Sequence, residues 1–438
     1  MGRFLSIFLA FASISSAWVK TYEIGRGYCV QQTIDGNYIL CASGWEDENE
    51  GGLRLIKIDT AGEIIWKKDY FSVEGGTGKC VRQTADGGYV IVGSIGAVES
   101  DLWLLKTDAN GDSLWAKTYG WWWQDQGRWV EQTKDGGYII TGTCDPGGWE
   151  FGDLWILKTD DKGDTLWTQI YNWDSYAYEL GNFIEECSDD NYIIGANFGL
   201  MKVGNTGDSL WVYNHGGGGG RSACQTSDGG YVFTATTWGP AGRRDIFQYK
   251  VGTDGDSLWA HSWGGADEDE SYCVQQTTDG GYIISGETRS FGEAEVNIWL
   301  IKTDSNGDTL WTRILDAGWG YSVQQTTDGG YIVSGGSKLI KTDSLGYAGV
   351  AEPTVTHPVI QPDWQVVSAI GPFVTLRYEN RPLGFHAQVF DASGRKVDEI
   401  TSTSPSGTIT WGEGRESGVY FLRGVDISNE VYKIIITR

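Results

Sequence analysis

One phrase, Gln-Thr-x-Asp-Gly-Gly-Tyr followed by an apolar run, recurs seven times along this chain with small variations. Its copies end in tyrosines at intervals of about fifty residues, which is the repeat length of a β-propeller blade and not of a helical solenoid. Six copies are followed by a phrase of the type Asp-x-x-Gly-Asp-x-Leu-Trp, but the seventh ends at Tyr347 without a tryptophan strand. The seven tyrosines are Tyr38, Tyr89, Tyr138, Tyr192, Tyr231, Tyr282 and Tyr331, and the six tryptophans are Trp66, Trp115, Trp167, Trp211, Trp259 and Trp311.

The strand missing from the last repeat has a counterpart at the start of the chain. Residues 18–22, Trp-Val-Lys-Thr-Tyr, match residues 115–119, which end a blade, yet they precede the first repeat. A ring closed by the N-terminal strand would leave no open sheet edge. The sequence therefore predicts an all-β fold, a seven-bladed β-propeller. The Asp-Gly-Gly and Asp-x-x-Gly-Asp turns would lie on one uniform rim and the variable loops on the other.

The chain divides into four parts. Residues 1–17, with Arg3, an apolar run over 4–12 and small residues at 15–17, form an expected signal peptide. The propeller is expected over 18–350 and a linker with three prolines over 351–365. An alternating pattern over 366–438 predicts a small Ig-like β-sandwich. No later stretch is long and apolar enough for a transmembrane segment, so we expect a secreted or cell-surface protein.

The net charge limits the possible partners, and the cysteine pattern indicates the role of the thiols. The formal net charge of -25 disfavours a nucleic-acid partner, because a phosphate backbone would be repelled. The seven cysteines are odd in number and include no Cys-x-x-Cys pair. Cys29, Cys80 and Cys273 share one place in three repeats, so we interpret them as small buried residues of an inner strand. We expect a monomer.

The loops of the variable rim are rich in tryptophan. An exposed indole gains little unless a ligand or partner covers it, and aromatic faces beside carboxylates and amides suit sugar rings. The competing interpretation is that these residues pack between blades. The candidate ligand-binding residues are Trp45, Trp121, Trp122, Trp123, Trp149, Trp173, Trp238, Trp263 and Trp319.

Metal and catalytic signatures are weak. The Asp-x-x-Gly-Asp turns offer oxygen donors such as Asp108, Asn110 and Asp112, but they lack the spacing and the final glutamate of an EF-hand loop. Asp capping of a tight hairpin explains the same residues, so we expect no metal or other cofactor and leave calcium open. The four histidines fall in unrelated contexts with no known catalytic motif. We therefore expect no enzyme; the catalytic alternative, a polysaccharide-cleaving propeller, needs two rim acids within about 5 to 10 Å.

Two resemblances extend this interpretation. Residues 276–282 and 299–304 resemble the repeats of exported bacterial and archaeal propellers, which implies the fold and little about a ligand. Residues 390–397, 410–412, 417–421 and 433–438 resemble the C-terminal sorting domain of type IX secretion and the related Ig-like domain of flagellar hook capping proteins. The sorting resemblance implies recognition by the secretion machinery through Gly418, Tyr420 and Lys433.

Together these features predict a non-catalytic binding protein. Its variable rim would contact a glycan or a surface protein, and its C-terminal domain would direct secretion or attachment. The closest alternative is a cell-surface scaffold without a small ligand.

Overall fold

The computed structural model describes residues 17–44, 52–71, 75–96, 99–121, 123–146, 152–172, 179–215, 219–239, 243–348, 364–368, 370–378, 385–391, 395–424 and 431–437. The chain separates into two compact units, Met1–Ala351 and Glu352–Arg438. Their boundary falls at the start of the proline-containing segment. Within the described residues, no helix is long and apolar enough to cross a membrane.

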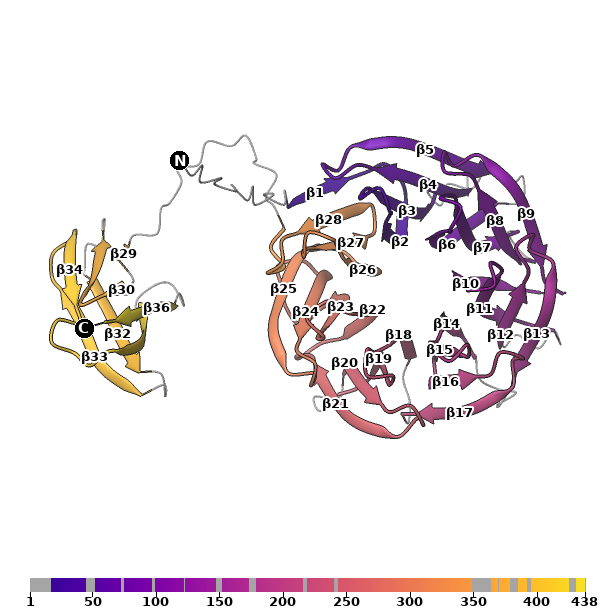
Figure 1. Cartoon of the computed structure of the whole chain (residues 1–438). Helices are drawn as coiled ribbons and strands as arrows, with labels where there is room; N and C mark the ends of the chain where they lie inside the picture. Colours follow the sequence, from indigo (N-terminus) through magenta and orange to yellow (C-terminus); the bar gives the residue numbers. More distant parts are fainter. Residues whose placement is uncertain are drawn as a thin grey trace, which may run out of the picture. The chain divides into compact units, whose positions relative to one another are not determined.

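The first unit is a ring of seven four-stranded antiparallel sheets in the described residues (Figure 1). Blade 1 consists of β2 (Arg26–Gln32), β3 (Tyr38–Ser43), β4 (Gly52–Ile58) and β5 (Ile64–Phe71). Blade 2 has β6 (Gly76–Gln83), β7 (Tyr89–Ile95), β8 (Asp101–Thr107) and β9 (Ser113–Tyr119), and blade 3 has β10 (Gln126–Gln132), β11 (Tyr138–Cys144), β12 (Asp153–Thr159) and β13 (Thr165–Tyr171). Blade 4 has β14 (Gly181–Glu186), β15 (Tyr192–Ala196), β16 (Gly199–Val203) and β17 (Ser209–Asn214).

Blade 5 has β18 (Gly219–Gln225), β19 (Tyr231–Trp238), β20 (Arg244–Val251) and β21 (Ser257–Trp263). Blade 6 has β22 (Asp269–Gln276), β23 (Tyr282–Thr288), β24 (Asn297–Thr303) and β25 (Thr309–Ala317). Blade 7 combines β26 (Ser322–Gln325), β27 (Tyr331–Gly335) and β28 (Lys338–Thr342) with β1 (Trp18–Thr21).

Ring closure by the N-terminal strand is confirmed. Strand β1 pairs antiparallel with β28, with Trp18 opposite Lys341 and Thr21 opposite Lys338. The Trp18 ring packs edge-on against Tyr38 of blade 1 at 6.1 Å between centroids. The indole of Trp66 meets Tyr89 of the following blade in the same way, at 6.0 Å. The tryptophan of one repeat therefore packs on the tyrosine of the next.

The repeated turn between the first two strands of a blade is held by a buried lysine from the third strand. In blade 2, Lys106 Nζ lies 2.8 Å from Asp86 Oδ2, and the Asp86 carboxylate also accepts the Gly88 N–H. Gly87 has φ of 82°, the positive value that the sequence predicts for this turn. The same ion pair occurs in every blade: Lys57–Asp35, Lys106–Asp86, Lys158–Asp135, Lys202–Asp189, Lys250–Asp228, Lys302–Asp279 and Lys341–Asp328.

The second glutamine of the repeat joins neighbouring blades. Gln83 Oε1 accepts the N–H of Ile34 from the turn of blade 1, at 2.8 Å. Thr327 of blade 7 donates to Gln32 of blade 1 at 2.8 Å, which completes the circle. Blade 4 carries Glu186 at this place, and its carboxylate accepts the Lys134 N–H instead. We call this rim, formed by the repeated turns, the hairpin rim.

The cysteines fit the interpretation as buried inner-strand residues. Cys29 Sγ donates to Val81 O at 3.6 Å, and Cys273 Sγ donates to Val323 O at 3.6 Å, in each case on the next blade. Cys29 and Cys80 lie 3.9 Å apart through their sulfur atoms, and all seven cysteines are free thiols.

The second unit contains two sheets. One has β29 (Trp364–Ser368), β31 (Val374–Tyr378) and β34 (Gly407–Trp411); the other has β30 (Ile370–Gly371), β36 (Val431–Ile436), β35 (Gly418–Gly424), β32 (Phe385–Asp391) and β33 (Lys396–Ser402). Val374 and Leu376 of the first sheet share one core with Phe385 and Val389 of the second. The unit is therefore all-β with a core of its own, whereas the specific Ig-like assignment stays a prediction.

Candidate functional site

The inner strands place two groups of side chains around the central channel. In six blades the inner strand has a β-bulge near the variable rim, so one residue has no partner on the second strand. A bulge redirects the side chain of the extra residue. These residues, with Tyr321 of blade 7, form what we call the channel mouth: Tyr28, Lys79, Arg128, Asn182, Arg221, Tyr272 and Tyr321.

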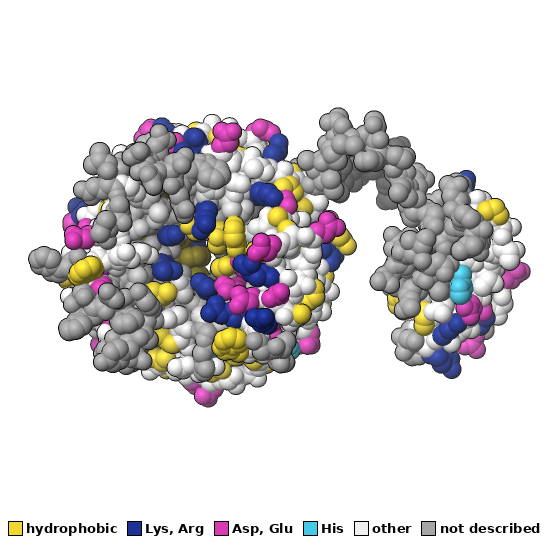
Figure 2. All heavy atoms as spheres, turned by 180° about the vertical axis from the view of Figure 1, so that it is seen from behind, with side chains coloured by type: hydrophobic (Ala, Val, Ile, Leu, Met, Phe, Trp, Pro, Cys, Tyr) yellow, Lys and Arg dark blue, Asp and Glu magenta, His cyan; other side chains and the backbone are white. Residues whose placement is uncertain are grey.

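The channel mouth has an aromatic arc and a cationic arc. The ring of Tyr321 lies 5.3 Å from Tyr28 and 5.1 Å from Tyr272 between centroids. Lys79 Nζ lies 3.8 Å above the Tyr28 ring, and the Arg128 guanidinium donates to Asn182 Oδ1 at 3.3 Å. Figure 2 shows lysine and arginine side chains gathered around the central opening on this face. Acidic side chains lie among them (Figure 2), since Glu270 pairs with Arg221 at 3.2 Å and with Arg244 at 3.3 Å. The mouth therefore carries mixed charge.

A rim pocket of about 500 Å³ lies beside the mouth. Trp123 is 51% exposed and forms part of its wall. Arg128 contributes a guanidinium and Asp145 a carboxyl group. The pocket therefore combines an aromatic face with hydrogen-bond donors and acceptors, as small-molecule pockets do. The other lining residues are Gln124, Gln126, Thr143, Gly152 and Leu180.

The other candidate tryptophans occupy different environments. Trp121 is 42% exposed, although its ring packs on Trp155 at 5.0 Å between centroids. Trp238 is 70% exposed and lines a smaller pocket of about 190 Å³ with Arg221 and Arg244. Four candidates lie outside the described residues: Trp45, Trp122, Trp149 and Trp173.

Trp263 and Trp319 are half-buried and do not project as free rim residues. Trp263 ends β21, and its Nε1 donates to Thr309 Oγ1 of the next blade at 2.8 Å. It stands four residues after Trp259, where blades 2 and 3 have a tyrosine whose hydroxyl reaches the next blade. Trp319 stacks on Tyr321, with Arg26 over its ring at 5.6 Å. Trp263 thus fills an inter-blade packing position, and Trp319 packs against the channel mouth through Tyr321.

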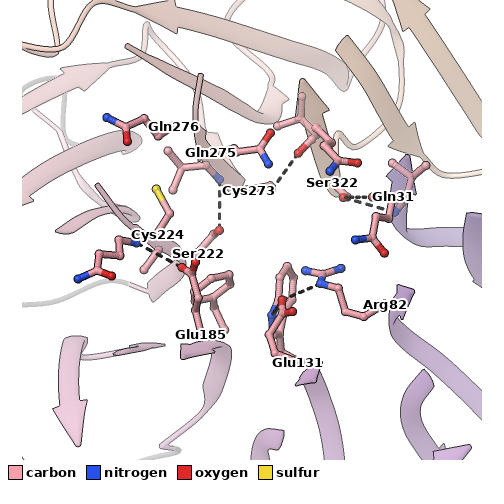
Figure 3. A pocket seen from close by; sticks show the side chains of 18 residues that line it. Gln31, Arg82, Glu131, Glu185, Ser222, Cys224, Cys273, Gln275, Gln276 and Ser322 are labelled. Atoms are coloured by element: carbon pink, nitrogen blue, oxygen red, sulfur yellow. Dashed lines mark hydrogen bonds and ion pairs between the residues drawn. The ribbon is translucent and has the colours of Figure 1, made fainter. Parts of the chain in front are cut away.

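A second cavity, of about 450 Å³, lies inside the channel toward the hairpin rim (Figure 3). The first residue of each Gln-Gln pair reaches this level of the channel. Three blades carry glutamine there: Gln31, Gln275 and Gln324. The other four carry Arg82, Glu131, Glu185 and Cys224. This cavity was not predicted from the sequence, although the change of residue at one repeat position is visible there.

The charged side of the cavity is built on Arg82 and two glutamates. Arg82 Nε donates to Glu131 Oε1 at 2.6 Å, and Trp129 Nε1 donates to the same oxygen at 3.1 Å. Glu185 Oε2 accepts the Gln225 N–H at 3.2 Å. Burial, followed by the charge of Glu131, raises the pKa of Glu185 to about 7. Its carboxyl group therefore titrates close to neutral pH.

Acidic residues of the variable rim are used within the fold. Asp125 accepts the Trp121 N–H at 2.6 Å and the Asp145 N–H at 3.0 Å through its two oxygens. Burial raises the pKa of Asp125, and burial also raises the pKa of Asp245, with a further contribution from Asp269. Such shifts occur at catalytic and at structural acids alike, so the expectation of no catalysis stays a prediction.

The Asp-x-x-Gly-Asp turns have hairpin geometry. Asp108 Oδ1 accepts the N–H groups of Asn110 at 2.9 Å and of Asp112 at 2.8 Å, and Gly111 has φ of 80°. In the described part of the chain, no group of three or more His, Cys, Asp or Glu residues could hold a metal ion. The Asp108 carboxylate thus serves the turn itself.

The three residues implied in sorting lie on adjacent strands of the second unit. Gly418 begins β35, and Tyr420 donates its hydroxyl to Glu416 O at 3.0 Å. Lys433 of β36 pairs with Phe421 of β35. The structure thus brings the three residues into one part of the five-stranded sheet.

Comparison with known proteins identifies the fold. No protein-family model matches the chain, and no curated protein matches it in sequence. The WD40 propeller domain of Doa1 is 14% identical, with a TM-score of 0.52 over 75% of this chain and 95% of that chain. The extracellular domain of the putative hybrid two-component system BT4673 of B. thetaiotaomicron is 12% identical, with a TM-score of 0.50 over 97% of this chain and 60% of that chain.

A bacterial surface protein is also among the structural neighbours. PorZ, a surface component of the type-IX secretion system of Porphyromonas gingivalis, is 10% identical, with a TM-score of 0.49 over 94% of this chain and 60% of that chain. The sheets and the match to the Doa1 domain define the first unit as a WD40-like β-propeller. The chain resembles bacterial extracellular propeller domains, and at these identities the likeness shows the fold alone.

Proposed function

We propose that this protein is a non-catalytic, secreted or surface-attached recognition module whose variable rim binds a glycan. The observation that carries the proposal is the rim pocket of about 500 Å³ built around the exposed Trp123. An indole face gains free energy when the C–H face of a sugar ring covers it. Arg128, Asp145 and two glutamines supply partners for the hydroxyl groups.

A glycan array tests this function. The full chain is labelled and applied together with Trp123→Ala. We expect the wild type to bind a defined group of glycans. The affinity of the variant for them should be at least about ten-fold lower, since an aromatic contact of this kind contributes about 1.4 kcal/mol or more.

Trp238→Ala is the matched control, because Trp238 is also an exposed rim indole but lines a different pocket. Equal losses in both variants would contradict a specific role for the Trp123 pocket. Absence of any glycan binding by the wild type would instead support the scaffold alternative or a surface-protein partner.

The second unit is proposed to direct secretion or surface attachment. The support is the sequence resemblance together with the adjacent placement of Gly418, Tyr420 and Lys433 in β35 and β36. In a host that has type IX secretion, Lys433→Ala should leave more of the chain inside the cell than Lys396→Ala, a substitution in the more distant β33. Equal export of the two variants would argue against recognition through Lys433.

A further inference from the structure

The central cavity is built from seven equivalent positions that no longer carry equivalent residues. In the three blades that carry glutamine at this position, the side-chain oxygen accepts a backbone hydrogen bond. Gln31 Oε1 accepts the Gln83 N–H, and Gln275 Oε1 accepts the Gln325 N–H. Gln324 Oε1 accepts the Gln32 N–H in the same way. The –NH₂ groups of these three amides are therefore the atoms left to donate into the cavity.

Glu185 occupies the same position on the opposite side. Its backbone partner is retained, because Glu185 Oε2 accepts the Gln225 N–H as a glutamine oxygen would. Arg82, which acts on Glu185 through its charge, forms its ion pair with Glu131 at 2.6 Å. Within the described residues, no lysine or arginine forms an ion pair with Glu185. A half-buried carboxylate without a cation is costly unless it is protonated or meets a positive ligand.

Aromatic rings complete the wall beside Glu185. The rings of Trp129 and Phe183 lie 4.7 Å apart between centroids and belong to neighbouring blades. Figure 3 shows Glu131 and Glu185 on one side of the cavity, with Gln31 and Gln275 across from them. The Arg82 guanidinium already lies over the Trp129 ring, 4.2 Å from its centroid, so the aromatic contact for a ligand comes from Phe183. An aromatic surface next to a carboxylate favours an organic cation, and about 450 Å³ is far more than one metal ion needs.

We propose that the central cavity binds a small ligand that carries a protonated amino group. Glu185 is its counterion, and the amides of Gln31, Gln275 and Gln324 donate to hydroxyl or carboxylate oxygens at the other end of the ligand. This site is separate from the rim pocket and stands independently of the glycan proposal.

Calorimetry with two matched polyols tests the inference. Glucamine and sorbitol differ only in an amino group that replaces one hydroxyl. The titration is made at about pH 8, above the pKa of Glu185 and below that of an alkyl amine. We expect glucamine to bind at least about ten-fold more tightly than sorbitol. Equal affinities, or no glucamine binding at roughly 10 mM, would overturn the proposal.

Glu185→Gln and Glu186→Gln form the matched pair of variants. Each removes one negative charge and introduces the residue that other blades carry at that position, so both should fold; their melting curves verify this. Only Glu185 lines the cavity. Glucamine affinity should fall about ten-fold or more in Glu185→Gln and stay unchanged in Glu186→Gln. An unchanged affinity in Glu185→Gln would overturn the proposal.

A pH series separates an ion pair from simple filling of the cavity. The ionisable groups that interact with Glu185 are Glu131 on β10, Arg82 on β6, Cys224 on β18 and Cys187 directly after β14. As the pH falls through about 7, Glu185 becomes protonated and wild-type glucamine affinity should decline. The same series with Glu185→Gln should be flat. A flat wild-type series would contradict the role of Glu185 as counterion.

Discussion

At the scale of residues, both positions of the Gln-Gln pair reach an adjacent blade, but the first of them faces the channel and varies more widely. Gln31, Glu185, Gln275 and Gln324 accept a backbone N–H of an adjacent blade. The second residue of the Gln-Gln pair accepts a backbone N–H from the neighbouring blade, so it is glutamine in six blades and Glu186 in the other. The first residue varies from Gln31 to Arg82 and Glu185. Substitutions at that channel position change the chemistry of the cavity without opening the ring.

Glu185 gives a pH-dependent stability with a defined sign. Its pKa is about 7 in the folded chain, against 4.5 for an unperturbed glutamate, so the folded state holds the proton more tightly between these values. Stability should therefore fall as the pH rises from about 4.5 to 7, by on the order of 2 to 3 kcal/mol. Urea unfolding at about pH 5 and pH 8 measures this. Glu185→Gln should lose this part of the dependence, and an identical pH response in variant and wild type would refute the assignment.

At the scale of elements, each repeated turn is stabilised by a lysine from the third strand of its own blade. Lys106 has only 5% of its side chain exposed, whereas its partner Asp86 has 58%. Burial raises the pKa of Asp86, but hydrogen bonds from Lys106 and Thr84 outweigh it and lower the pKa to about 2. The ion pair therefore stabilises the turn above about pH 4, and the contribution is lost as the pH falls through about 2.

Lys106→Met tests this contribution. The variant leaves the Asp86 carboxylate without its cation, so we expect a loss of about 2 to 3 kcal/mol at neutral pH. Lys68→Met is the control, since Lys68 pairs with Asp112 on the surface, where the side chains are 38% and 66% exposed. That control should cost less than about 1 kcal/mol. Equal losses in urea unfolding would show that burial of the lysine is unimportant.

The sequence was sufficient for the blades but not for the channel. The repeated tyrosines and the displaced strand at Trp18 predict seven blades and their closure, because these residues pack between blades. The β-bulges of the inner strands could not be predicted from the sequence. One extra residue in a strand redirects side chains such as Arg128, and no local residue preference indicates where that extra residue lies. The packing of Trp263 between blades could have been predicted from the sequence, since Trp263 occupies the repeat position that Tyr119 occupies in blade 2. Rim loops could be assigned only as a group, because their positions depend on contacts that no repeat encodes.

At the scale of the whole molecule, the ring depends on a short strand from the opposite terminus. Trp18 and Tyr22 are 7% and 8% exposed, and Tyr22 donates its hydroxyl to Gly62 O at 2.9 Å. Strand β1 thereby covers the edge of β28. Without it, the last blade would present an unpaired strand edge that can pair with another chain.

Removal of residues 1–22 should therefore open the ring. We expect a lower melting temperature and concentration-dependent self-association, because two buried aromatic side chains are lost at about 3 to 5 kcal/mol each. Thermal melting and size-exclusion chromatography measure the two effects. The control begins at Ala17 and keeps β1. A truncated chain that stays monomeric with an unchanged melting temperature would contradict a structural role for β1.

Ring closure also determines when the fold can be completed. The contact between Gln32 and Thr327 joins residues 295 positions apart, and contacts over such separations form slowly because a long segment of chain must first be restricted. Blade 7 cannot be completed until β28 has been synthesised and β1 has paired with it. The position of one strand thus makes completion of the ring wait until almost the whole propeller sequence is available.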